Sequence, residues 1–122
     1  MEKKVGGKND GCVHRLVAIR DAMDVLNGKW KIPIIASLSL NGKMRFMDLL
    51  REVDGIAAKM LSKELMGLET NLLITRTVMD TRPVTVEYEL TAHGRTLNKI
   101  IKEIGDWGVL HRKEILETKF MN

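Results

Sequence analysis

The sequence predicts a mostly α-helical fold with one small β-hairpin, an α+β arrangement within a single domain. Apolar residues recur every three or four positions through most of the chain, as they do on the buried face of a helix. Only residues 84–90 show a clear alternation of apolar and polar side chains, the pattern of a half-buried strand. The length of 122 residues suits one domain with a modest core.

The composition is that of an ordinary globular protein, with 44% hydrophobic and 30% charged residues. The 20 Lys and Arg residues outnumber the 16 Asp and Glu residues, and this mild excess is compatible with a polyanionic partner without requiring one. The single cysteine, Cys12, provides no disulfide framework and favours a reducing compartment, so we expect a cytoplasmic protein. No apolar run is long enough to span a bilayer.

The N-terminal segment is charged and contains glycine, and it has no apolar run typical of a signal peptide. We expect residues 1–12 to form a flexible leader and residues 13–122 to form the folded domain. The first helix is predicted over about 13–26, and Asn27 and Gly28 end it. Its apolar stripe consists of Leu16, Ile19, Met23 and Leu26.

Two shorter helices follow in the prediction. The first spans about 29–40, with Pro33 in its first turn, where proline is tolerated. Its apolar face consists of Trp30, Ile34, Ile35 and Leu38. The second spans about 45–53 and ends before the turn-forming pair Asp54 and Gly55. Its apolar face consists of Phe46, Leu49, Leu50 and Val53.

A fourth helix and a hairpin come next. The helix is predicted over about 57–71, with an inward stripe of Leu61, Leu65, Leu68 and Leu72. Residues 74–79 and 84–90 are the expected strands, and a polar link that contains Arg82 and Pro83 joins them. The hairpin therefore has a basic tip.

Thr91 is expected to cap a last helix whose apolar stripe is too long for one small core. Such a protruding amphipathic helix is typically buried against a second copy of itself. We expect the dimer contact to consist of Ile100, Ile104, Trp107 and His111, completed by the first helix. The alternative is that these residues fold back on their own domain.

Two short helices separated by a glycine turn and followed by a hairpin are typical of a winged helix-turn-helix, here with an extended C-terminal dimerisation helix. A helix fits the major groove of DNA, so residues 57–71 are the expected recognition helix and residues 79–85 the wing. The expected DNA contacts are Arg45, Ala58, Lys59, Ser62, Lys63, Arg76 and Arg82. Arg76 can instead form a local salt bridge, and Lys29 and Lys31 are further candidates for phosphate contact.

The motifs resemble those of the HxlR family of bacterial transcriptional regulators over roughly residues 17–110. The residues that carry the resemblance are Asn27-Gly28-Lys29-Trp30-Lys31, Arg45-Phe46-x-Asp48-Leu49, Ile56-x-x-Lys59-Met60-Leu61-Ser62, Leu65-x-x-Leu68-Glu69, Arg76 and Val86-Glu87-Tyr88-x-Leu90-Thr91-x-x-Gly94. The resemblance implies a dimeric repressor or activator. It also implies that DNA is contacted by the helix that holds Lys59 and Lys63 and by the wing that holds Arg82.

The chain departs from the family pattern at two places. Many members carry a Cys-Pro pair where this chain has Val17 and Ala18, and Cys12 lies five residues earlier without a following proline. Cys12 is therefore either an oxidisable thiol, favoured by nearby cationic side chains, or an inert residue near the leader. Ala57 and Ala58 stand where a polar cap is expected, which leaves the first amides of the recognition helix uncapped and free to meet a phosphate.

Other chemistry finds little support in the sequence. Cys12-x-His14 lacks a second cluster with metal-ligand spacing, and no phosphate-binding loop or paired nucleophile and base occurs. We therefore expect no metal site, no cofactor and no catalytic residue. The expected partners are double-stranded DNA with a palindromic site and a second copy of the chain. The alternative function is a winged-helix protein-interaction module without DNA binding.

Overall fold

The computed structural model describes residues 7–121, apart from the side chains of residues 7–10, 12, 120 and 121. Its elements in chain order are α1 (Gly7–Leu26), α2 (Lys31–Asn41), β1 (Met44–Arg45), α3 (Phe46–Glu52), α4 (Ala58–Thr70), β2 (Ile74–Met79), β3 (Thr85–Leu90), α5 (Ala92–Arg95) and α6 (Asn98–Met121). The strands form a three-stranded antiparallel sheet in the order β1-β3-β2. This architecture confirms the predicted fold class, a mostly helical winged helix-turn-helix with a long C-terminal helix.

The core lies where α2, α3 and α4 meet the base of the hairpin. Ile34, Ile35, Leu49, Leu61 and Leu68 are fully buried, and every one of them lies on the face that its helical periodicity predicts. Tyr88 and Leu90 of β3 close the core from the side of the sheet. Burial of these side chains stabilises the domain by about 1.5–3 kcal/mol each, and it fixes which face of α4 points outward.

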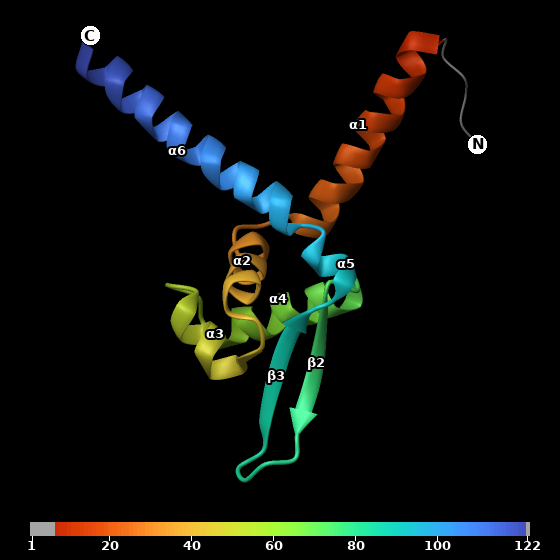
Figure 1. The fold of residues 1–122 in the computed structure, drawn as a ribbon, viewed down its shortest axis with the longest axis vertical. Helices are drawn as coiled ribbons and strands as arrows, with labels where there is room; N and C mark the ends of the chain where they lie inside the picture. Colours follow the sequence, from red (N-terminus) through yellow and green to blue (C-terminus); the bar gives the residue numbers. More distant parts are fainter. Residues whose placement is uncertain (1–6, 122) are drawn as a thin grey trace.

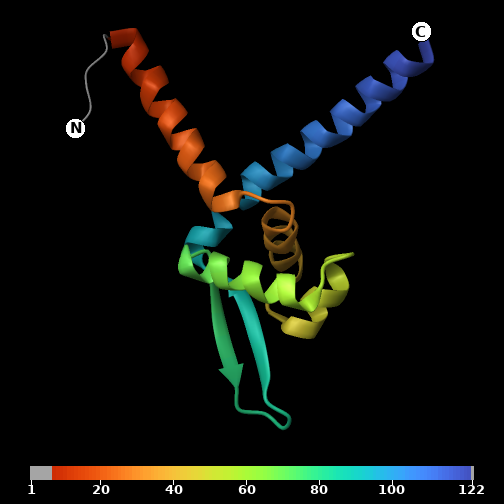
Figure 2. The ribbon, with the colours of Figure 1, turned by 180° about the vertical axis from the view of Figure 1, so that it is seen from behind.

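Helices α1 and α6 project from the body of the domain, as Figure 1 shows. They diverge from a common point and lie on the side opposite the tip of the β2–β3 hairpin. The view from behind in Figure 2 shows α4 lying across α2, with the hairpin descending beside it. The chain therefore presents two distinct regions: a body with α4 and the hairpin, and two arms formed by α1 and α6.

Two elements in the N-terminal half of the chain differ from the prediction. Helix α1 begins at Gly7, so residues 7–12 of the expected leader are helical, and residues 1–6 lie outside the described residues. Gly11, in the interior of α1, costs the helix about 1 kcal/mol relative to alanine but does not end it. Residues 44–45 form the short strand β1, whose Met44 pairs with Tyr88. A strand of two residues is too short to produce a period in the sequence.

The expected last helix is broken into α5 and α6. The amides of Thr96 and Leu97 donate to the carbonyls of His93 and Gly94, three residues back, at 3.1 Å each. The Thr96 hydroxyl also donates to the His93 carbonyl at 2.5 Å. This tighter turn ends α5 before α6 begins, because a threonine side chain competes with the helical ladder for a backbone acceptor.

Leu72, expected on the inward stripe of the fourth helix, is 70% exposed instead. Helix α4 ends at Thr70, and the side chain of Asn71 donates to the carbonyl of Gly67 at 3.1 Å. Leu72 then adopts a φ of 64°, which turns the chain into β2. Leu73, which is 3% exposed, takes the core position in its place.

Candidate nucleic-acid interface

Helix α4 separates its side chains into two faces. Leu61, Leu65 and Leu68 point into the core. The side chains expected to contact DNA, Ala58, Lys59, Ser62 and Lys63, are exposed. The short and polar residues predicted for DNA contact therefore lie on the solvent face of α4, because the leucine stripe fixes the rotation of the helix about its axis.

The cationic side chains expected to contact DNA form no close pair with an acid among the described residues. Within the part of the chain that the structure describes, no ion pair or hydrogen bond involves the side chains of Arg45, Lys59, Lys63, Arg76 or Arg82. The alternative of a local salt bridge for Arg76 is therefore not observed among those residues. Unpaired cations keep their charge available for an anionic partner such as phosphate.

The hairpin carries two of these arginines at different distances from the body of the domain. Arg76 lies in β2 opposite Tyr88 of β3, and Arg82 lies in the connecting loop, where it is exposed. Thr81 organises this loop, since its hydroxyl donates to the carbonyl of Pro83 at 2.9 Å and lies 3.2 Å from the Thr85 hydroxyl. The loop thus presents Arg82 at the tip, as the sequence predicts.

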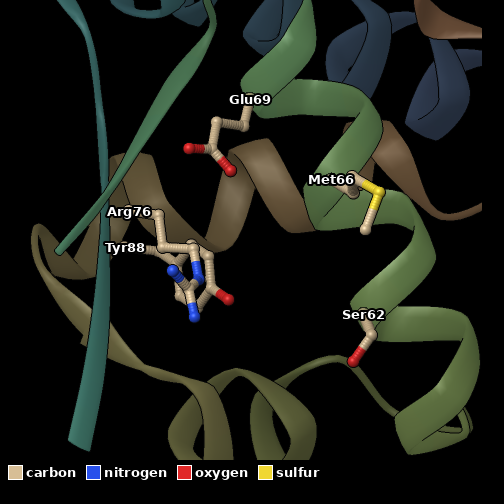
Figure 3. A pocket seen from close by; sticks show the side chains of 5 residues that line it. All are labelled: Ser62, Met66, Glu69, Arg76 and Tyr88. Carbon is tan, nitrogen blue, oxygen red and sulfur yellow. The ribbon is translucent and has the colours of Figure 1, made fainter. Parts of the chain in front are cut away.

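Helix α4 and the hairpin together line an open groove of about 370 Å³. Figure 3 shows Ser62, Met66 and Glu69 along α4 on one wall and Arg76 and Tyr88 on the other. The groove demonstrates that the outward face of α4 and the inner edge of the wing form one continuous surface. Met66 and Glu69 were not among the expected DNA contacts, although their spacing from Ser62 (i+4 and i+7) places them on the same helical face.

The N-terminal end of α4 carries no side-chain cap. Ala57 occupies the capping position in an extended conformation, and its side chain makes no cap hydrogen bond. Arg45 occupies the corresponding position before α3 and is exposed. The first amides of α4 are therefore without a side-chain acceptor, as the alanine pair predicts.

Lys31 is not available for the phosphate contact considered for it. Its Nζ atom lies 2.5 Å from Oε1 of Glu64, and the two side chains are only 14% and 11% exposed. Lys29 instead lies over the ring of Trp30, with Nζ 4.7 Å from the ring centroid. The position of a lysine at the start of a helix does not predict the direction of its side chain. Here Lys31 points toward α4, because Glu64 on the inner face of that helix provides an acid partner.

The two projecting helices, α1 and α6, each carry several exposed apolar side chains. On α6 the expected contact residues Ile100, Ile104 and Trp107 are 49%, 47% and 60% exposed, and the ring of Trp107 stacks on His111 with centroids 4.8 Å apart. The exposed apolar residues of α1 are Val13, Leu16, Val17, Ile19 and Met23. The expected contact residues thus do not fold back on their own domain.

The thiol, metal-binding and membrane-spanning features considered from the sequence can be examined only within the described residues. Cys12 lies in α1, but its side chain is outside the described residues, so its role as a thiol stays a prediction. The described residues contain no cluster of three or more His, Cys, Asp or Glu side chains able to hold a metal ion. No helix in residues 7–121 combines the length and apolar character needed to cross a membrane.

Comparison with known proteins gives consistent matches. Residues 25–115 match the model of the HxlR-like helix-turn-helix family. The uncharacterised HTH-type transcriptional regulator YtcD of Bacillus subtilis is 35% identical over 85% of this chain and 82% of its own. The redox regulator HypR in its reduced form superposes with a TM-score of 0.75 at 35% identity, covering 83% of this chain and 98% of that one. A crystal structure of YtcD gives a TM-score of 0.73 at 37% identity, covering 78% and 96%.

Proposed function

Because this chain belongs to the HxlR-like helix-turn-helix family of transcriptional regulators, we propose that it binds double-stranded DNA sequence-specifically and acts as a homodimer. One observation carries the proposal: the exposed side chains of Lys59, Ser62 and Lys63 on α4 and the wing arginines lie on elements that share one groove, and their charges are unpaired among the described residues. These unpaired cations are complementary to the phosphates of a duplex.

In the proposed complex α4 enters the major groove. A lysine can donate to O6 and N7 of guanine or to a phosphate, and a serine hydroxyl can donate or accept at a base edge. The backbone at Ala58 can approach closely because its side chain is small. Arg45, before α3, and the uncapped amides of α4 provide phosphate contacts that fix the register of the helix.

The wing supplies the second contact. Arg82 at the loop tip is suited to the minor groove, whose negative potential is strongest over narrow A·T tracts. Arg76 lies in β2, nearer the body of the domain than Arg82, and contacts the phosphate backbone of the DNA in this proposal. The wing thereby adds a preference for groove shape to the base contacts of α4.

The projecting helices support a homodimer. Their exposed apolar residues need a covering surface, and a second copy of the same arms provides one. In the proposed dimer Ile100, Ile104, Trp107 and His111 form the contact, together with α1. A two-fold dimer would read a palindromic site with half-sites about 34 Å apart, one turn of DNA. The protein is proposed to act in the cytoplasm, where the DNA is, and to catalyse no reaction.

The alternative, a protein-interaction module without DNA binding, differs in one measurable property. A DNA-binding protein with six to ten phosphate contacts loses roughly 10³–10⁵ in affinity between about 50 and 200 mM salt. Fluorescence anisotropy with a labelled random-sequence duplex measures this dependence directly. Absence of binding at the lowest salt concentration would favour the interaction module.

A further inference from the structure

We propose that the Lys31–Glu64 ion pair sets the orientation of α4 on α2 and that operator discrimination depends on it. The inference rests on the proposed function, because it concerns how α4 meets the bases. Lys31 and Glu64 do not touch DNA in this proposal. They act as positioning residues for Lys59, Ser62 and Lys63.

The pair joins the two helices at the inner face of α4. Glu64 is 9% exposed and lies among the core leucines of the helix, next to Leu65. Its neighbours Ser62 and Lys63 point outward. Successive residues of a helix are about 100° apart around its axis. The leucines decide which face of α4 is buried. Holding the carboxylate of Glu64 on Lys31 narrows the rotation that remains, and so refines the direction in which the outward side chains point.

Trp30, which precedes α2, and Lys31, the first residue of α2, lie near α4 at two places. The side chain of Lys31 also passes Gly67 of α4, where a Cβ atom would lie 3.6 Å from its Cε. Trp30 packs at the turn before α4, since a Cβ atom on Gly55 would lie 3.8 Å from the ring. The Trp30 ring therefore lies beside the loop that leads into α4, and the Lys31 side chain lies beside the helix itself.

A buried ion pair is better suited to specifying a geometry than to adding stability. Removing two charges from water is costly, and an apolar pair of similar volume is often equally stable. A charge pair, unlike an apolar pair, is satisfied only when the two groups meet. Glu64 among leucines therefore has a physical rationale as a constraint on the rotation of α4.

The double variant Lys31→Met/Glu64→Met separates the stability of the protein from its discrimination between duplexes. We expect its melting temperature to stay within about 5 °C of the wild type, because the apolar pair fills the same space. The preference for the operator should nevertheless fall at least about tenfold, the effect of losing one good base contact. The probes are the duplex that the wild type enriches from a random pool and a scrambled duplex of the same composition.

The matched control is Lys102→Met/Asp106→Met, which removes the same charges from an exposed pair on α6, 3.1 Å apart with the side chains 76% and 68% exposed. Its preference should equal that of the wild type. Charge reversal gives a second test. Glu64→Lys alone places two ammonium groups together and should abolish the preference, and adding Lys31→Glu should restore it at least tenfold.

Three results are decisive. A wild-type preference in the folded double methionine variant, or no restoration by charge reversal, would overturn the role of the pair while leaving DNA binding intact. If the wild type itself prefers no duplex, the proposed function fails instead. Loss of preference in the methionine pair with recovery on charge reversal would support the inference.

Discussion

The α-carbon of Gly94 packs directly against the backbone of Leu73. A Cβ atom on Gly94 would overlap the Leu73 carbonyl oxygen and would lie 3.2 Å from Cδ2 of Leu90. Thr91 strengthens the same junction, because its amide donates to the Leu73 carbonyl at 3.0 Å and its hydroxyl donates to the Leu72 carbonyl at 2.8 Å. The start of α5 is thereby fastened to the turn that follows α4, which connects the region of α4 to the arm formed by α6.

Gly94→Ala should destabilise the protein by at least about 2 kcal/mol, because the new methyl group meets a backbone carbonyl rather than a flexible side chain. The control is Gly67→Ala in α4, whose Cβ would make only an ordinary contact of 3.6 Å with Lys31. That change should be neutral or stabilising by up to about 1 kcal/mol. Chemical denaturation followed by circular dichroism measures both. Equal stabilities for the two variants would contradict this packing.

Lys59→Ala and Ser62→Ala should weaken binding to the selected operator more than binding to a scrambled duplex. We expect a loss of about 1–3 kcal/mol on the operator, because each side chain is proposed to meet a base edge. Competition binding with both duplexes measures the difference. The control is Lys119→Ala near the end of α6, which should change neither affinity. Equal losses on operator and scrambled duplex would mean that these residues contact only the backbone.

Arg82→Ala should weaken binding mainly to operators with A·T-rich flanks. A narrow minor groove concentrates negative potential, so the guanidinium is worth more there than over G·C pairs. Two operators that differ only in their flanks, measured in parallel, provide the test. If the variant loses the same factor on both, the wing contacts phosphates without reading groove width.

Trp107→Ala should raise the dissociation constant of the dimer by about 30-fold or more, which corresponds to the roughly 2 kcal/mol of a buried aromatic contact. Sedimentation velocity over a concentration series measures the change. Val109→Ala is the matched control, because Val109 is 72% exposed but lies two residues away on the opposite side of α6. An unchanged dimer in the Trp107 variant would remove this residue from the interface.

The helices of the core and their outward faces follow from the sequence, because leucine and isoleucine periodicity determines both. Because Leu61, Leu65 and Leu68 of α4 are buried, Lys59 and Lys63 were correctly predicted to face solvent. The hairpin follows equally well from the alternation in β3. The core helices and the hairpin depend on local sequence patterns, and the structure contains them where those patterns predict them.

Other features depend on contacts between distant segments and were not predictable in the same way. The ion pair of Lys31 joins residues 33 positions apart. Glu64 does carry a signal in retrospect, since an acid within a leucine stripe needs a buried cation. The strand β1 exists only because β3 lies beside it, and Leu72 leaves the core because its backbone turns at a positive φ.

Selection of bound sites from a random duplex pool by the wild-type protein tests the central claim most directly. We expect one enriched motif with two-fold symmetry, whose half-sites are separated by about one turn of DNA, roughly 34 Å. Recovery of no motif, together with no salt-dependent affinity for any duplex, would contradict DNA binding by α4 and the wing.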